Sequence, residues 1–403
     1  MLKGRKTQKG VQLFDPFKNC DYNFSDTTWT IIKTIKKHGM EEAVSKIMST
    51  FNIDEKNAKE DIETVLSNLK TLNLKLEEIP FSVSNVKYAP RTVHFDITGK
   101  CNSKCIYCYV TDRLDTSEEL STQQILRVLD ELAELDTWTI MVSGGEPFLK
   151  KDLLKILKRL EEIGISTSIL TNGMFITDNI AKNLASLKNI GMIQISLDSS
   201  DPKHHNLHRG IEDAYEKTLK GIKNLKKYGV TPKIEMVVTP YNVNDIENTI
   251  EFLYKLGVKS ITIGPAMMHA GRGSKNKQKL FFDKELLKST GKKIMELNKK
   301  YKGSMCISPI REFLAYSTDN RVSKEEIKCG VGTSILYISP KGLVYPCLFS
   351  IYPKTLLGDI KRESLSEIWK KSKILKKFRD THVPDIEKCE LCDFKYIYDL
   401  IIK

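Results

Sequence analysis

The sequence predicts an α/β protein whose centre is a run of repeated strand–helix units. Short β-branched apolar runs alternate with amphipathic stretches in the middle of the chain, and helical periodicity dominates residues 11–82. Two strand-like runs near the C-terminus are joined by a turn at Ser339–Gly342. Because 403 residues suffice for two or three domains, we expect domains at 1–82, 83–300 and 301–403.

The N-terminal unit is expected to combine a small sheet with helices. Two extended stretches precede three helical patterns, the first of which Ser25 or Asp26 would cap. The elements expected are strands at Val11–Phe14 and Cys20–Phe24 and helices at about 25–38, Glu41–Phe51 and Ala58–Leu72. This order predicts a short helical bundle packed on a small sheet.

The central region is expected to form a parallel sheet. The predicted strands are Val93–Thr98, Thr139–Gly144, Ser166–Thr171, Met192–Asp198, Lys233–Thr239 and Ser260–Pro265. Helical stretches follow the strands, as at Leu149–Ile163, Asp178–Leu187, Tyr215–Tyr228 and Ile246–Leu256. Repeated strand–helix units require right-handed parallel crossovers, so the pattern alone leaves open a doubly wound sheet and a partial barrel. A hairpin, Ser334–Ser339 with Leu343–Phe349, and a helix near Leu365–Phe378 are expected after it.

The charge is strongly positive, with 64 Lys and Arg against 51 Asp and Glu, a formal net charge of +13. Such a balance suits nucleic acid, a membrane surface or an acidic ligand. The lysines are spread along predicted helix faces, which favours a compositional bias, and we do not expect nucleic acid. No apolar stretch approaches the roughly 20 residues that cross a bilayer, so we expect a cytoplasmic protein with no membrane partner.

Seven of the nine cysteines are grouped, which in a reducing cytosol indicates metal binding or catalysis. Cys101, Cys105 and Cys108 follow the first predicted strand of the parallel sheet, at the edge where such folds place active sites. Three thiolates can hold three irons of a 4Fe–4S cluster and leave the fourth iron open. A zinc site would need a fourth ligand, and the nearest candidate, His94, lies within a strand. His204, His205 and His208 are expected to be solvated rather than metal ligands.

The spacing Cys-x3-Cys-x2-Cys, with an aromatic residue before the last cysteine, resembles the signature of the radical S-adenosylmethionine (SAM) superfamily. Gly144-Gly145-Glu146-Pro147, Thr171-Asn172-Gly173, Ser196-Leu197-Asp198-Ser199 and His205 to Gly210 match that family in register. The resemblance implies a partial (β/α)6 barrel in which a 5′-deoxyadenosyl radical abstracts a substrate hydrogen. It implies Cys101, Cys105 and Cys108 as catalytic cluster ligands, and as SAM contacts Tyr107, Gly144, Gly145, Glu146, Asn172, Ser196, Asp198 and Arg209.

The remaining grouped cysteines are Cys329, Cys347, Cys389 and Cys392. On spacing alone, a hairpin followed by Cys-x2-Cys also fits a structural zinc site. In a chain with the radical SAM signature, the pattern resembles the SPASM auxiliary-cluster domains in their truncated "twitch" form. The resemblance implies a second 4Fe–4S cluster on these four cysteines, which relays an electron. Cys20 and Cys306 have no assigned role.

Residues 11–82 resemble the pyrroloquinoline-quinone peptide-chaperone-like domain, or RiPP recognition element. This winged-helix-like α+β domain binds the leader of a ribosomally made precursor peptide. The edge strand near Cys20–Phe24 and the helix near Ile62–Leu69 are the expected groove. A generic winged helix that binds nucleic acid is the alternative, and balanced charges in this segment favour the peptide.

The leading hypothesis is therefore a radical SAM enzyme that forms a thioether or carbon–carbon cross-link in a precursor peptide. Epimerisation of a peptide is the second choice. Two further hypotheses are a twitch-type dehydrogenase acting on a small molecule and a non-enzymatic Fe–S or zinc protein that binds nucleic acid. A flavodoxin or ferredoxin is expected as reductant. An adjacent short reading frame encoding a precursor would favour the first hypothesis.

Overall fold

The computed structural model describes residues 2–7, 10–15, 20–84, 86, 88–111, 116–268, 270–309 and 330–380. Three of the predicted auxiliary-cluster ligands, Cys329, Cys389 and Cys392, lie outside these residues. Contacts within the chain divide it into two compact units, Met1–Ala89 and Pro90–Lys403. Each unit is described by itself.

The N-terminal unit begins with an antiparallel sheet in the order β1 (Lys3–Thr7), β2 (Gly10–Asp15) and β3 (Cys20–Phe24). The strands β2 and β3 agree with the sequence pattern, but β1 was not expected because its residues are polar. It forms because it pairs along its whole length with β2. The backbone of Ser84 bonds to β1, through Ser84 N to Gly4 O and Lys6 N to Ser84 O.

Two long helices and a short 3-10 turn complete this unit: α1 (Asp26–Phe51), α2 (Glu55–Thr71) and η1 (Leu76–Glu78). Gly39 has a φ of 75°, so α1 consists of two segments that meet where the first two helical patterns meet in the sequence. Ser25 and Asp54 cap α1 and α2 by accepting from the backbone of Thr28 and Asn57. The apolar helix faces pack on the sheet as one core.

The second unit is built on one ten-stranded sheet in the order β10-β9-β8-β7-β6-β5-β4-β11-β12-β13. Neighbouring strands from β10 to β11 are parallel. The first seven strands along the chain are β4 (Thr92–Thr98), β5 (Thr139–Gly144), β6 (Ser166–Thr171), β7 (Ile190–Ser196), β8 (Lys233–Val238), β9 (Ser260–Pro265) and β10 (Cys306–Pro309). The six predicted central strands are all present, and β10 was not predicted.

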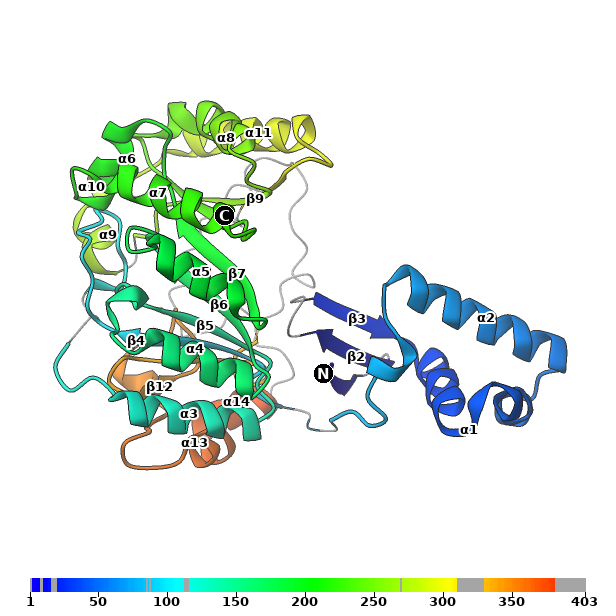
Figure 1. The fold of residues 1–403 in the computed structure, drawn as a ribbon. Helices are drawn as coiled ribbons and strands as arrows, with labels where there is room; N and C mark the ends of the chain where they lie inside the picture. The colour runs from blue at the N-terminus through cyan, green and yellow to red at the C-terminus, as the bar shows by residue number, and fades with distance from the viewer. Residues whose placement is uncertain are drawn as a thin grey trace. The chain divides into compact units, whose positions relative to one another are not determined.

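The described helices between β4 and β10 are α3 (Thr122–Glu134), α4 (Leu153–Glu162), α5 (Asp178–Ser186), α6 (Pro202–Arg209), α7 (Ala214–Lys227), α8 (Ile246–Lys255), α9 (Gly271–Lys275), α10 (Lys277–Leu280) and α11 (Lys284–Lys300). In Figure 1, α4, α5 and α7 lie along one side of the sheet. Strand residues alternate accordingly: in β8, Ile234, Met236 and Val238 are fully buried. The α/β class is confirmed, with the one-sided helical cover of a partial barrel.

The C-terminal hairpin extends the barrel sheet. Strand β11 (Ile335–Ile338) lies parallel to β4, with Tyr337 opposite His94, and β12 (Leu343–Tyr345) turns back against β11. The short β13 (Gly358–Asp359) follows, and the predicted last helix is two helices, α13 (Leu365–Lys371) and α14 (Lys373–Asp380). The hairpin that carries Cys347 therefore neighbours the strand that leads to Cys101.

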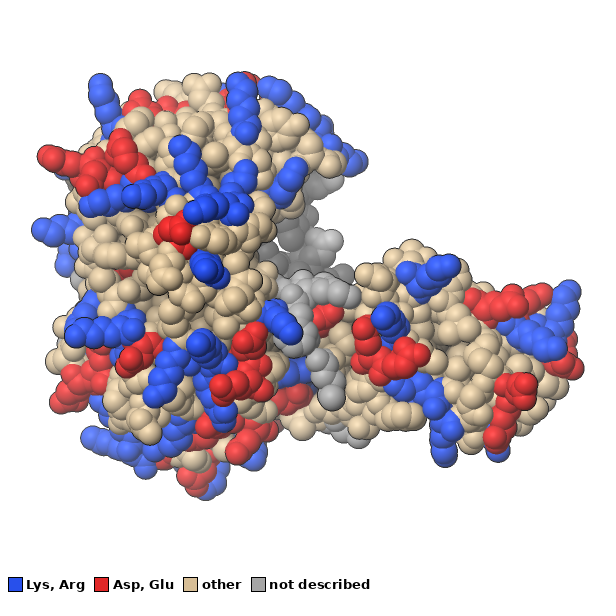
Figure 2. All heavy atoms as spheres, in the orientation of Figure 1, with Lys and Arg blue, Asp and Glu red and all other residues tan. Residues whose placement is uncertain are grey.

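Charged side chains of both signs are interspersed over the face drawn in Figure 2, so the net charge of +13 is not gathered there in one patch. Within the described part of the chain, every helix is too short or too polar to span a bilayer.

Candidate functional site

The three-cysteine loop follows β4 and is tied to the end of β5. Gly145 N donates to Thr98 O over 2.8 Å, and Glu146 N donates to Lys100 O over 2.7 Å. Gly144 has a φ of 135°, and a Cβ there would lie 2.2 Å from Thr98 O. A Cβ on Gly145 would lie 2.2 Å from Lys100 O. Both glycines are thus required for the cysteine loop to pack on β5.

Two helical segments hold the loop from other sides. At the end of α6, Arg209 O and His208 O accept from the backbones of Lys104 and Ile106 over 2.9 and 3.0 Å. From α9, Arg272 Nε donates to Cys105 O over 2.9 Å. Asn276, directly after α9, donates from Nδ2 to Ile106 O over 2.8 Å. The sequence of 271–279 predicts only a basic loop, because nothing in its pattern indicates these partners.

The three thiols remain partly accessible: Cys101 is exposed and Cys105 and Cys108 are half-buried. Ser103 N donates to Cys101 Sγ over 3.4 Å, and Arg209 Nη1 donates to Cys105 Sγ over 3.8 Å. Burial raises the pKa of the Cys108 thiol, and the neighbouring Cys105 adds to this increase. Arg272 and Arg209 act to lower the same pKa.

These thiols suit an iron–sulfur cluster better than a single ion. Among the described residues, no three Cys, His, Asp or Glu side chains are close enough together to hold one metal ion. A 4Fe–4S cluster places each thiolate on a separate iron, and donors to the sulfurs tune it. A loop with three accessible thiols, N–H donors and a guanidinium beside them fits this group.

Glu146 is buried within the loop's support, with 1% of its surface exposed. Its Oε1 accepts from Thr171 Oγ1 over 2.7 Å and from Phe148 N over 3.2 Å, and its Oε2 accepts from Asn172 N over 2.9 Å. Burial raises the pKa of Glu146 to about 7, although these hydrogen bonds act to lower it. The carboxyl joins the ends of β5 and β6, and its two oxygens are engaged by protein donors.

Asn172 continues this support toward the cysteines. Its Nδ2 donates to Asn102 Oδ1 over 2.8 Å and lies 3.4 Å from Ser103 Oγ. Asn102 and Ser103 stand between the first two cysteines of the loop. The end of β6 therefore fixes the segment that positions Cys101 and Cys105.

Asp198 organises a second buried network, just past the end of β7. Its Oδ2 accepts from Tyr107 Oη over 2.8 Å and lies 2.8 Å from Arg209 Nη2, and its Oδ1 accepts from Val237 N over 3.0 Å. Although burial opposes ionisation, Arg209 and His208 hold the pKa of Asp198 below its usual range. The guanidinium of Arg209 also lies over the Tyr107 ring, 5.5 Å from its centroid.

The expectation of solvated histidines is wrong for two of the three. His205 and His208 are fully buried, because α6 turns its C-terminal end onto the cysteine loop. His205 Nδ1 accepts from Asp198 N over 3.2 Å, and burial lowers the pKa of His205 to about 3, so it is neutral. His208 Nε2 pairs with Thr239 Oγ1 over 2.8 Å. Neither role follows from sequence, because both depend on partners remote in the chain.

Two further predicted residues, Ser196 and Cys347, are among those that the structure describes. Ser196 ends β7, opposite Glu235 of β8. Cys347 follows β12, and the ring of Phe349, two residues later, stacks on Tyr109 with centroids 6.4 Å apart. Tyr109 directly follows Cys108, so the two cysteine-bearing loops lie side by side.

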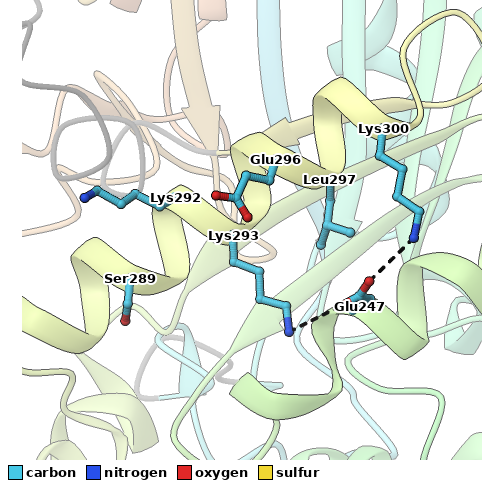
Figure 3. Close-up of a pocket in the computed structure, with 7 residues that line it drawn as sticks. All are labelled: Glu247, Ser289, Lys292, Lys293, Glu296, Leu297 and Lys300. Carbon is cyan, nitrogen blue, oxygen red and sulfur yellow. Dashed lines mark ion pairs between the residues drawn. The ribbon is translucent and has the colours of Figure 1, made fainter.

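A separate surface pocket lies between α8 and α11 (Figure 3). Its lining comes from these two helices, with Lys293 and Lys300 both directed at Glu247, at 3.6 and 3.5 Å. None of its side chains belongs to a strand end or to the cysteine loop. We do not assign it to the chemistry.

Comparisons with known proteins identify two domains. Residues 95–253 match the radical SAM superfamily, and residues 329–393 match SPASM, an iron–sulfur cluster-binding domain. The chain is 28% identical to a PqqA peptide cyclase of Granulibacter bethesdensis, over 75% of this chain and 79% of that protein. It is 25% identical to the AdoMet-dependent heme synthase of Methanosarcina barkeri, over 77% of this chain and 90% of that protein. The mycofactocin maturase MftC of Mycolicibacterium smegmatis is also 25% identical, over 72% of this chain and 73% of that one.

Solved structures share the fold. Streptococcus suis SuiB superposes with a TM-score of 0.71 at 17% identity, over 98% of this chain and 95% of that one. AdoMet-bound anSMEcpe has a TM-score of 0.57 at 20% identity, over 75% of this chain and 87% of that one. These matches confirm the partial barrel, and the domain matches support two iron–sulfur clusters and SAM as cofactors. The chain thus carries a radical SAM domain followed by a SPASM domain.

Proposed function

We propose that this protein is a radical SAM enzyme that modifies a ribosomally made precursor peptide, with a thioether or carbon–carbon cross-link as the first choice of product. The observation that carries the proposal is the combination, in one chain, of the braced cysteine loop with a separate N-terminal unit that has an open sheet edge. The named activities of the PqqA peptide cyclase and of MftC support a peptide substrate.

The N-terminal unit suits a bound strand at β3. The outer side of β1 is engaged by Ser84, whereas no described residue pairs with the outer edge of β3. An extended leader that adds to β3 would gain backbone hydrogen bonds without rearranging the unit. Ile62, Val65 and Leu69 of the expected groove helix are buried in the unit's own core, so the proposal rests on the strand edge.

In the proposed enzyme, Cys101, Cys105 and Cys108 hold the first 4Fe–4S cluster, which together with SAM supplies hydrogen-atom abstraction when bound. The residues proposed to bind SAM or to shape its site are Tyr107, Gly144, Gly145, Glu146, Asn172, Ser196, Asp198 and Arg209. Their contacts brace the cysteine loop, and a site held in this way needs little rearrangement on loading. Arg209, whose guanidinium fork matches a carboxylate, is the proposed partner of the SAM carboxylate.

The second cluster is proposed to lie on Cys329, Cys347, Cys389 and Cys392. Four protein ligands leave no open iron, so transfer of an electron is its proposed role. The neighbouring loops of Cys108 and Cys347 support this role, because electron transfer favours short separations. We propose flavodoxin or ferredoxin as the reductant and a cytoplasmic location.

Two other reactions remain candidates. Peptide epimerisation uses the same hydrogen abstraction and would leave the peptide mass unchanged. A small-molecule substrate is favoured by one specific observation, the 25% identity to a heme synthase over 90% of that protein.

A binding experiment distinguishes peptide from small-molecule substrates. The probe is the peptide encoded by a short reading frame beside the gene, labelled and titrated with cluster-loaded enzyme. When residues 1–89 are deleted, we expect the affinity for the peptide to fall at least about tenfold, because the leader then loses several strand hydrogen bonds. Uncoupled SAM cleavage should persist in the deleted protein. Equal binding by both proteins would contradict leader recognition by the N-terminal unit.

A further inference from the structure

Three carboxyl groups around the cysteine loop differ in their partners. Glu146 accepts three hydrogen bonds, and Asp198 accepts two besides its ion pair with Arg209. The Glu235 carboxyl makes no hydrogen bond or ion pair with any residue that the structure describes. A half-buried carboxyl that no described residue engages lacks the partners that stabilise Glu146 and Asp198, which makes Glu235 a candidate for a functional role.

The side chain of Glu235 lies on the face of β8 opposite the helices. Ile234 and Met236 on either side are fully buried, while Glu235 is half-buried. Because side chains alternate along a strand, Glu235 shares its face with Lys233 and Val237. That face lines the interior of the partial barrel.

The same face contacts the cysteine loop. Val237 packs against the cluster of Tyr107, Ala266 and Leu280, to which Cys105 also contributes. Glu235 stands two residues before Val237, about 7 Å along the strand. Its carboxyl is therefore one step deeper in the barrel than the loop that carries the catalytic cysteines.

The strands beside Glu235 present small polar side chains. Ser196 of β7 and Thr262 of β9 are its register partners, and Ser308 of β10 is opposite Thr262. Burial raises the pKa of Glu235 to about 7; Lys233 and Arg209 act to lower it, and Asp198 acts to raise it. This row of side chains is polar and carries hydroxyl groups that can form hydrogen bonds.

The geometry points to Glu235 as a substrate-contacting residue whose carboxyl binds a hydrogen-bond-donating or cationic group of the precursor peptide. This inference rests on the proposed function. Asp198 accepts hydrogen bonds from Tyr107 and Val237 and pairs with Arg209, so an entering donor meets in Glu235 a carboxyl that no described residue engages. A cationic donor would also favour the ionised carboxylate.

The test compares Glu235→Gln with the wild-type holoenzyme, using the peptide from the adjacent reading frame as probe. We expect the amount of product formed per SAM cleaved to fall by about tenfold to a hundredfold. A change of this size corresponds to the free energy of one hydrogen bond to a charged group. SAM affinity and SAM cleavage without peptide should not change. Glu235→Asp, which keeps the charge, should recover part of the loss, and Glu247→Gln on the outer surface should behave as wild type.

The inference would be overturned if Glu235→Gln formed as much product per SAM cleaved as the wild type. It would also be overturned if SAM affinity without peptide fell as much as product formation, because the residue would then belong to the cofactor site. If the wild-type enzyme itself leaves the peptide unmodified, the proposed function fails instead. In that case, carboxyl labelling of the holoenzyme with a carbodiimide and glycine ethyl ester still tests whether Glu235 is accessible from the barrel interior. Labelling of Glu235 but not of Glu146 or Asp198 is expected, and an unlabelled Glu235 would refute its access to the barrel interior.

Discussion

The two units of this protein bury different kinds of side chain. In the N-terminal unit the core is aliphatic and aromatic, and Asp15 is the one buried charged side chain among its described residues. Around the cysteine loop, Glu146, Asp198 and Arg209 are all buried. Apolar packing tolerates many changes, whereas a buried charge requires its partner. Apolar packing therefore holds the N-terminal unit together, whereas the site in the second unit needs its buried charged side chains in place together.

The largest expected effect comes from the loop at the centre of the charged region. Cys105→Ala should abolish the formation of 5′-deoxyadenosine under reduction, because the cluster loses a ligand. The iron content should fall by one cluster. Cys20→Ser, in the N-terminal unit, serves as the matched control and should cleave SAM normally. Continued SAM cleavage by Cys105→Ala would mean that the site is elsewhere.

Breaking the buried network should cost stability in the barrel alone. Asp198→Asn leaves Arg209 uncompensated, so the free energy of unfolding should fall by about 3–5 kcal/mol. Urea unfolding followed through Trp138 and Trp369, in a Trp29→Phe background, measures this unit. Asp178→Asn, which removes an exposed ion pair with Lys227, should have little effect. Equal losses in both variants would refute the special role of the buried network.

Replacing Glu235 should change stability in the opposite direction to replacing Asp198, because no described residue pairs with the Glu235 carboxyl. Its folded-state pKa of about 7 is raised above the unfolded value, so the protonated form stabilises the fold at low pH, and that stability is lost as pH rises through 7. Glu235→Gln removes this loss. The free energy of unfolding of the variant should therefore rise relative to that of the wild type by up to about 1.4 kcal/mol per pH unit between pH 5 and 7. Parallel stability curves would contradict the raised pKa.

The smallest effect is expected in the N-terminal unit. Asp54→Ala removes the cap of α2 and should lower the stability of this unit by about 1 kcal/mol. The measurement is urea unfolding followed through Trp29 for this unit and through Trp138 and Trp369 for the barrel, and the exposed mid-helix variant Glu63→Ala is the control. The barrel transition should stay in place. A shift of both transitions would show that the units do not unfold independently.

Much of the fold was predictable from local pattern. The six central strands, the two helical segments that meet at Gly39 within α1 and the hairpin near Gly342 appear where apolar periodicity and turn residues placed them. The strand β1 could not be predicted, because Lys3–Thr7 carries no apolar pattern and forms only by pairing with β2. The attachment of the hairpin to β4 likewise depends on long-range pairing.

The motifs of the candidate site could be predicted from the sequence, but the residues that hold the cysteine loop in place could not. Spacing and position after a strand predicted the cysteine site, the family resemblance predicted the Gly144–Pro147 turn, and the structure brings the two segments together. Sequence did not indicate that Arg272 and Asn276 hold the loop, nor that His208 is buried, since these depend on segments far apart in the chain. Glu235 was missed because a single polar residue in an apolar strand gives no distinctive pattern.

The mass of the precursor peptide tests the central claim most directly. The reconstituted holoenzyme is incubated with SAM, a reductant and the peptide from the adjacent reading frame, in H2O and in D2O. The account predicts a product that has lost two hydrogen atoms and is absent with Cys105→Ala. Deuterium uptake without that loss would indicate epimerisation instead. An unchanged peptide in both solvents, alongside active SAM cleavage, would contradict peptide modification.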